Sequence, residues 1–243
     1  MINSAFSRTT EEQVAQASQM ACSILADVSG RRGSLDGRIR SLAPSMRLCG
    51  PALTVEVRPG DNLMIHAALV LAQPGDVIVV DGKANTTSAL VGELMCAHAR
   101  AAGVAGLVID GSVRDVGELR SGSFPVFACA SNPNGPSRQL AGRIGHPISV
   151  GGVAVEPGDL IAGDADGVVV VPRAGVAQAL LDARKKMDSE RQRMRDIAEG
   201  RLLYGWLEGA LRDAGVLPRG LSLEQLAAEF AAARAGVHAS REK

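Results

Sequence analysis

The chain contains 243 residues, of which 46% are hydrophobic, 21% are charged and only 2% are aromatic. Its 26 basic and 26 acidic side chains leave no net charge, which argues against a protein that binds nucleic acid over its whole surface. With one Trp, one Tyr and four Phe, the chain also lacks the aromatic platforms on which single-stranded nucleic acid stacks.

The cysteines and the apolar segments indicate the compartment. The four cysteines lie far apart and form no CxxC pair, so neither a disulfide framework nor a zinc ribbon is expected. The first residues hold no apolar signal segment, and no apolar stretch approaches the roughly 18 residues of a membrane span. We therefore expect a soluble, cytoplasmic protein with reduced thiols.

The first third of the chain alternates helix and strand patterns. Residues 9–27 have the pattern of one capped helix, which ends at the Gly-rich segment 30–37. An alternating segment predicts a strand over 50–57. Asp61 is then placed to cap a helix over 62–72.

A strand, a helix and a second strand follow. Residues 76–82 and 106–111 are short apolar runs, which are typical of strands buried on both faces. A helical segment over 86–102 separates them, and this order predicts a βαβ crossover. The helix begins either near Thr87 or at Gly92.

The two starting points for this helix differ in their chemistry. A helix that begins at Gly92 leaves the backbone amides of Leu94 and Met95 unpaired, and such amides form a site for a carboxylate or a phosphate. The alternative is an ordinary first turn, in which Glu93 interacts favourably with the helix dipole.

The pattern changes after residue 120. Short strands with tight turns are predicted within 124–130 and 148–172, as in a β-meander or a Greek key. A long helix over 174–199 follows Pro172 and ends at Gly200.

The remaining residues form a weaker pattern, with a helix over 221–235. We place one domain at residues 1–200 and a helical extension at 201–243. The Ala-rich extension is interpreted as a packing or oligomerisation element.

The segment GLVIDGSVRD contains the strongest candidate site. Arg114 and Asp115 come just after a buried strand, and α/β sheets commonly bind ligands beyond the carboxyl ends of their strands. The two side chains can form a structural ion pair. They can equally hold an anionic substrate and a hard cation, because a carboxylate is a natural ligand of Mg²⁺.

A carboxylate also interrupts the apolar stripe of the long helix. Glu190 falls on that stripe, where a buried and unpaired charge would be costly. Glu190 therefore either lies at the edge of the core or interacts with a specific partner. The stripe itself consists of Val176, Leu180, Ala183, Met187, Met194 and Ile197.

Several common catalytic patterns are missing from the sequence. The histidines form no HxH or HExxH spacing, which argues against a zinc hydrolase, and neither GxSxG nor GxGxxG occurs. Cys96 and His98 lie on different faces of their predicted helix, so they do not form a nucleophile pair.

Several sequence blocks in a fixed order resemble the RraA-like family over roughly residues 20–200. These blocks are GRRG, GPALTV, PGDNLMIHAAL, PGDVIVVDG, GELM, GLVIDGSVRD, FPVFA and VEPGDLIAGDADGVVVVP. The family includes class II pyruvate aldolases that act on 4-hydroxy-4-methyl-2-oxoglutarate and 4-carboxy-4-hydroxy-2-oxoadipate. It also includes non-catalytic regulators of ribonuclease activity, which lack the Asp of the GxVRD segment. The presence of Asp115 and of GRRG favours the aldolase branch.

The resemblance implies an α/β fold of the swivelling β/β/α type. Such a fold has a β-sandwich or barrel-like core with flanking helices. The resemblance further implies trimers or hexamers with sites at subunit interfaces, a small-molecule 2-oxo acid substrate and a bound Mg²⁺ or Mn²⁺. It implies neither a membrane nor a nucleic-acid partner.

The resemblance also implies roles for individual residues. Arg114 resembles the Arg that holds the keto oxygen of the substrate and stabilises the pyruvate enolate, and Asp115 resembles the acidic residue that anchors the metal. Gly92, Leu94 and Met95 resemble the loop whose backbone amides bind the pyruvyl carboxylate.

Three further carboxylates take their roles from the same resemblance. Glu93 falls where the aldolases carry an acidic residue near a catalytic water. Glu190 aligns with a Glu that a neighbouring subunit contributes, in contact with the metal through water. Asp27 stands where the aldolases usually have Glu, and its contact to the metal would also run through water.

The expected reaction is a divalent-metal-dependent retro-aldol cleavage. A 4-hydroxy-2-oxo dicarboxylic or tricarboxylic acid would give pyruvate and a second 2-oxo acid, and oxaloacetate would be decarboxylated through the same enolate. The alternatives are a protein-binding regulator of a ribonuclease, and a lyase or hydrolase that acts on a different 2-oxo or hydroxy acid. The C4 substituents would be read by side chains such as Arg31, Arg32, Asn62 or His66, although the two arginines fit a flexible basic loop equally well.

Overall fold

The computed structural model describes residues 1–218 and 220–239. The chain divides into two compact parts, Met1–Asp188 and a second part that begins at Ser189. This boundary lies inside the helix α6 (Val176–Ala198), whereas the sequence pattern placed it at residue 200. Among the described residues, no helix has both the length and the apolar character that crossing a membrane requires.

The first part is built around one sheet of eight strands. Its order is β1 (Arg40–Ser41), β5 (Val126–Ser131), β4 (Gly106–Val113), β3 (Val77–Val91), β2 (Leu48–Glu56), β9 (Leu160–Asp164) and β10 (Gly167–Val171), with β6 (Arg143–Ile144) also paired to β2. The strands β2, β3, β4 and β5 are mutually parallel, and β9 runs antiparallel to β2. A separate hairpin consists of β7 (Ile148–Val150) and β8 (Val153–Val155).

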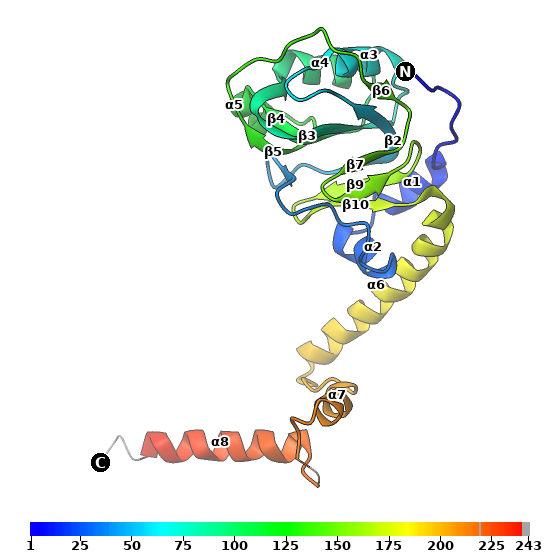
Figure 1. The fold of residues 1–243 in the computed structure, drawn as a ribbon. Helices are drawn as coiled ribbons and strands as arrows, with labels where there is room; N and C mark the ends of the chain where they lie inside the picture. Colours follow the sequence, from blue (N-terminus) through cyan, green and yellow to red (C-terminus); the bar gives the residue numbers. More distant parts are fainter. Residues whose placement is uncertain (219, 240–243) are drawn as a thin grey trace. The chain divides into compact units, whose positions relative to one another are not determined.

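The strand β2 belongs to two layers of the fold. Its residues 52–56 pair with β3, and its residues 48–51 pair with β9. Figure 1 shows β7, β9 and β10 beneath the sheet formed by β2 to β5. A long strand that bends from one layer into the other thus connects the two halves of the β core.

Helices cover both outer faces of this core (Figure 1). The helices α3 (Leu63–Leu71), α4 (Glu93–Ala101) and α5 (Val116–Ser121) pack on β2 to β5. The helices α1 (Glu11–Ala17) and α2 (Cys22–Val28) and the first turns of α6 pack on β9 and β10. The prediction of a mixed α/β fold with a sheet and flanking helices is confirmed.

The apolar runs of the central strands serve two cores at once. In β3, Ile78 and Val80 face the helices α3 to α5, whereas Val77 and Val79 face the core shared with β7, β9 and β10. This alternation follows from the two-residue period of a strand. The prediction that residues 76–82 are buried on both faces is confirmed, because every residue from Val77 to Gly82 is buried.

The prediction of a single helix over 9–27 is wrong. It is two helices, α1 and α2, separated by residues 18–21. Thr10 caps α1, and the carboxylate of Asp164 accepts a hydrogen bond from the Cys22 amide at 2.9 Å. The first turn of α2 is therefore stabilised by a side chain that is distant in the sequence.

The predicted helix over 86–102 is wrong at its beginning. The strand β3 continues to Val91, because its last residues pair with β4 through shifted registers and the Ala89 amide donates to the Asn134 carbonyl. Four short elements were not predicted, namely β1, β6, α5 and α7 (Leu207–Asp213). The long helix α6 begins after a 3-10 turn at Arg173–Gly175, and the last helix is α8 (Leu223–Ala239).

Candidate functional site

The candidate site begins where β3 passes into α4. Gly92 is the N-cap residue of α4. In the first turn, the Glu93 amide donates to the Asp115 carboxylate, and no side chain caps the amides that follow. The interpretation in which the helix begins at Gly92 is therefore confirmed. The amides of Leu94 and Met95 lie in this first turn, where a helix has no backbone partner for them.

The end of β4 lies beside this turn. Val91 and Val113 pair in register, and the Arg114 amide donates to the Val91 carbonyl at 3.0 Å. Asp115 follows with left-handed backbone angles (φ 56°, ψ 39°), which few residues other than Gly, Asn and Asp adopt readily. This turn directs the Asp115 side chain back toward α4.

The Asp115 carboxylate connects the two chain segments. Its Oδ2 accepts a hydrogen bond from the Glu93 amide at 2.9 Å and lies 3.7 Å from the Arg114 Nε. The side chains of Arg114 and Asp115 are each 41% exposed. Within the described residues, the Arg114 guanidinium donates no hydrogen bond, so its donors are available to a ligand.

The chemistry of this arrangement suits an anion and a hard cation together. Two backbone amides and a guanidinium can bind carboxylate or enolate oxygens. Asp115 alone does not form a closed metal cage, and no group of three or more His, Cys, Asp or Glu in the described part of the chain could hold a metal. Mg²⁺ is commonly bound by one or two carboxylates together with waters and substrate oxygens, and Asp115 fits that mode.

The structure brings Gly92, Glu93, Arg114 and Asp115 together, but not Asp27. Glu93 begins α4, and its side chain is exposed. Asp27 lies on α2 and pairs with Lys186 at 3.0 Å, and this hydrogen bond lowers the pKa of the Asp27 carboxyl. Because α2 packs on β9 and β10, Asp27 and Asp115 belong to opposite faces of the first part.

Glu190 lies in the second compact part, on the exposed surface of α6. The apolar stripe that carries it is buried only near its start. Val176, Leu180 and Ala183 are buried, whereas Met194 is 66% exposed. The stripe therefore does not place Glu190 in a core of this chain.

Polar residues that support the site were only partly recognised from the sequence. The Asn62 amide nitrogen donates to the Leu90 carbonyl at 2.8 Å and contacts the Met95 sulfur at 3.3 Å, so Asn62 supports the turn that begins α4. Arg31 is strongly exposed and pairs weakly with Asp27. In His66, burial together with the nearby Arg138 and His98 lowers the pKa of the imidazole.

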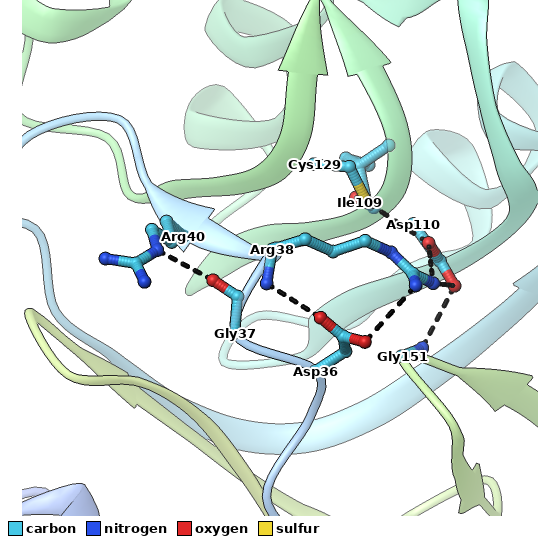
Figure 2. Close-up of polar contacts among 8 residues, drawn as sticks. All are labelled: Asp36, Gly37, Arg38, Arg40, Ile109, Asp110, Cys129 and Gly151. Atoms are coloured by element: carbon cyan, nitrogen blue, oxygen red, sulfur yellow. Dashed lines mark hydrogen bonds and ion pairs between the residues drawn. The ribbon is translucent and has the colours of Figure 1, made fainter.

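A buried carboxylate fixes the strand that leads to Arg114. Asp110, within β4, accepts hydrogen bonds from Arg38 at 3.1 Å and from the Gly151 amide at 2.9 Å. Figure 2 shows these groups around the carboxylate. The Cys129 thiol donates to the same carboxylate at 3.1 Å, and burial, reinforced by Asp110, raises the pKa of this thiol to about 11. Asp110 thereby connects β4, β5, the loop before β1 and the turn between β7 and β8.

Cys96 is buried in α4 behind the candidate site. Burial, together with the charge of Asp115, raises the pKa of its thiol to about 12. The thiol is therefore protonated near neutral pH, which excludes an activated thiolate at this position.

Gly92→Ala is expected to reduce activity without unfolding the protein. A Cβ atom at Gly92 would lie 2.4 Å from the Asp115 Oδ2 and 3.0 Å from the Arg114 Cγ. The backbone of Gly92 is extended (φ −142°), so any residue can adopt it and only the clash remains. We expect kcat/KM for an anionic substrate that binds at this site to fall at least about 10-fold, because misplaced reacting groups are costly.

Gly117→Ala is the matched control for this variant. A Cβ atom at Gly117 meets no atom within 4 Å, and this residue lies in α5, directly after the same site. Steady-state kinetics and thermal unfolding of both variants give the comparison. Full activity in a folded Gly92→Ala protein would show that the position of the Asp115 carboxylate does not matter for turnover.

Comparisons with known proteins place these features in a family. A family model described as RraA-like, Aldolase/RraA, matches residues 13–170. A protein of Halalkalibacterium halodurans with the provisional name 4-hydroxy-4-methyl-2-oxoglutarate aldolase is 40% identical over 166 residues, which cover 68% of this chain and 79% of the relative.

Solved structures show the same fold. An uncharacterised protein from Pseudomonas syringae pv. tomato is 26% identical with a TM-score of 0.72, covering 80% of this chain and 96% of that protein. The RNA-processing inhibitor RraA from Thermus thermophilis is 30% identical with a TM-score of 0.58, covering 63% of this chain and 92% of that protein. Both an aldolase name and an inhibitor name thus occur among the relatives.

Proposed function

Because the chain belongs to the RraA-like family, we propose that it is a divalent-metal-dependent pyruvate aldolase with oxaloacetate decarboxylase activity. The substrate would be a 4-hydroxy-2-oxo dicarboxylic or tricarboxylic acid. The aldolase name of the 40% identical relative supports a lyase. The proposal rests above all on one observation, the convergence of the α4 amides, the Arg114 guanidinium and the Asp115 carboxylate at the ends of β3 and β4.

Each group has a role in binding the pyruvyl half of the substrate. The amides of Leu94 and Met95 would bind its carboxylate, since the start of a helix favours an anion. The Arg114 guanidinium would donate to the keto oxygen at C2. Asp115 would hold Mg²⁺ or Mn²⁺, which supplies Lewis-acid stabilisation of the negative charge on that oxygen.

The retro-aldol step breaks one carbon–carbon bond and moves two protons. The C4 hydroxyl loses its proton to a base, for which we propose a water held by Glu93 and by Glu190 of a neighbouring subunit. The C4 oxygen forms a carbonyl as the C3–C4 bond breaks, so the C4 fragment leaves as a 2-oxo acid. The pair from that bond forms the C2–C3 double bond, and the carbonyl pair moves onto the C2 oxygen to give the pyruvate enolate. Arg114 offsets the charge that develops there, and C3 then takes up a proton to give pyruvate.

Oxaloacetate would use the same groups. Its C3–C4 bond breaks with loss of CO₂, and the electron pair again moves to the C2 oxygen. Both reactions share the enolate, so a site that stabilises it should support both.

We also propose that the protein forms a trimer or hexamer with sites at the subunit interfaces. A single carboxylate is a sparse donor set for a metal, and Glu190 of a neighbouring subunit would add a second carboxylate through water. Asp27 lies on the opposite face of its own subunit, so it would reach such a site only from a neighbouring subunit and only after its ion pair with Lys186 breaks.

The test is the release of pyruvate from oxaloacetate, followed with lactate dehydrogenase. We expect turnover that EDTA abolishes and that Mg²⁺ or Mn²⁺ restores, after subtraction of the decarboxylation by free metal. The same assay with 4-hydroxy-4-methyl-2-oxoglutarate then examines aldol cleavage. If a folded, metal-supplemented protein gives no turnover above background, the proposal fails and a ribonuclease-binding regulator becomes the better description.

A further inference from the structure

The segment between β5 and β6 lies across the candidate site. Residues 132–140, here called the strap, contain the turn-forming sequence NPNGP but no helix or strand. No residue of the strap was expected to contribute to the site. The contacts at its two ends and at its centre indicate a function for it.

The first end of the strap is held by the strands that carry the site. The Asn132 amide donates to the carbonyl of Val113, the residue before Arg114, at 3.0 Å. Asn134 accepts from the Ala89 amide at 2.8 Å and donates to the Thr87 carbonyl at 3.1 Å. This end therefore follows the ends of β3 and β4.

The second end is held by one buried carboxylate. Asp61 is 1% exposed, and its Oδ2 accepts hydrogen bonds from the Ser137 hydroxyl, the Gln139 amide and the Leu140 amide, at 2.6, 2.7 and 3.1 Å. Burial acts to raise the pKa of the Asp61 carboxyl, but these bonds and one from the Leu63 amide lower it overall. An ionised acceptor makes each of these bonds stronger than a neutral one would.

Between its two ends, the strap contacts the Arg114 guanidinium. A Cβ atom built on Gly135 would lie 3.3 Å from the Arg114 Nη1, so Gly135 lies beside that nitrogen and a larger side chain there would press on it. No hydrogen bond to another described residue fixes the guanidinium. Gly135 of the strap and the Asp115 carboxylate, 3.7 Å from Nε, are therefore neighbours that limit where the guanidinium can lie.

We propose that Asp61 is a positioning residue, which holds the strap against Arg114 and thereby keeps the guanidinium directed at the ligand. The kinetic consequence rests on the proposed function, whereas the contact itself does not. The proposal predicts that weakening the Asp61 end of the strap releases Arg114 selectively.

Asp61→Asn tests this directly. Asparagine cannot accept hydrogen bonds at both of its polar atoms, so either the strap or the start of α3 loses its acceptor. Ser137→Ala removes a strap donor and leaves α3 untouched, which keeps the test valid if Asp61→Asn fails to fold. Asp182→Asn, at a partly exposed carboxylate on α6 that pairs with Lys185, is the matched control.

The primary measurement is the rate at which phenylglyoxal modifies each arginine, mapped by mass spectrometry. We expect Asp61→Asn to raise the rate at Arg114 severalfold, Ser137→Ala to raise it less, and Asp182→Asn to leave it unchanged. Arg120, on the adjacent α5, is the internal reference, because general unfolding would raise both rates. Equal rates at Arg114 in the wild type and in a folded Asp61→Asn protein, or parallel rises at Arg120, would overturn the proposal.

Kinetics then connect the strap to turnover. We expect kcat for oxaloacetate to fall about 10-fold in Asp61→Asn, with the Mg²⁺ dependence unchanged, because a displaced guanidinium stabilises the enolate less well. Lack of turnover in the wild type would count against the proposed function alone, since the modification rates still decide the role of Asp61. Faster modification of Arg114 with unchanged kcat would show that the strap does not position Arg114 for catalysis.

Discussion

Exchanging Asp115 for asparagine is expected to lower metal-dependent turnover of oxaloacetate by at least about 100-fold, because the variant loses the carboxylate that would bind the cation. Asparagine has nearly the same shape and adopts left-handed backbone angles readily, so the φ of 56° at this position is retained. Its side-chain oxygen can still accept the hydrogen bond from the Glu93 amide. The substitution therefore removes charge while it preserves the turn.

The measurement is a Mg²⁺ titration of initial rates, together with thermal unfolding. Asp166→Asn is the control, since Asp166 is an exposed residue in the turn between β9 and β10. We expect the control to match the wild type, and Asp115→Asn to unfold at nearly the wild-type temperature. Metal-stimulated turnover within about 3-fold of the wild type in Asp115→Asn would remove this carboxylate from the proposed mechanism, since a loss of only about 0.7 kcal/mol is too small for a metal ligand.

Arg114→Lys is the second substitution with a large expected effect. Lysine retains the positive charge but replaces a planar fork of donors by a compact ammonium group. Removal of one donor to a developing oxyanion commonly costs about 10²- to 10³-fold in kcat, and we expect a loss in this range. The Mg²⁺ concentration that gives half-maximal rate should stay near its wild-type value, because Asp115 is unchanged.

Two comparisons make the result specific to the guanidinium. Arg120→Lys is the matched control, as Arg120 is exposed on the neighbouring helix and donates to the Leu42 carbonyl. Added guanidinium chloride at millimolar concentration should partly restore an Arg114→Ala protein. Full activity in Arg114→Lys would mean that a point charge is sufficient and that the forked geometry does not contribute.

The parts of the fold that local sequence determines were predicted well. The apolar runs of β3 and β4 identified strands buried on both faces. Successive side chains of a strand point to opposite faces, so a run without polar residues has no face suited to water. The break between α1 and α2 was missed, since the acceptor at the start of α2 is Asp164, a residue 142 positions away. The length of β3 was missed for a similar reason, because Asn134 pairs with its last residues.

The candidate site shows the same division between local and distant causes. The placement of Arg114 and Asp115 after a buried strand followed from the sequence pattern. The left-handed turn at Asp115 brings its carboxylate to the Glu93 amide. Asp adopts these angles readily, but nothing in the neighbouring sequence requires them at this position. The strap was visible only as a run of turn-forming residues, and its attachment to Asp61 depends on residues about 76 positions apart.

The bend of β2 between two layers has a consequence for synthesis of the chain. Val79 in β3, Val108 in β4 and Phe127 in β5 form an apolar sheet face, which is covered by strands that begin only after residue 147. A growing chain must therefore carry this face uncovered until β7 to β10 have left the ribosome. Such late, long-range closure slows folding and leaves sheet surface exposed to other chains while the last strands are being made.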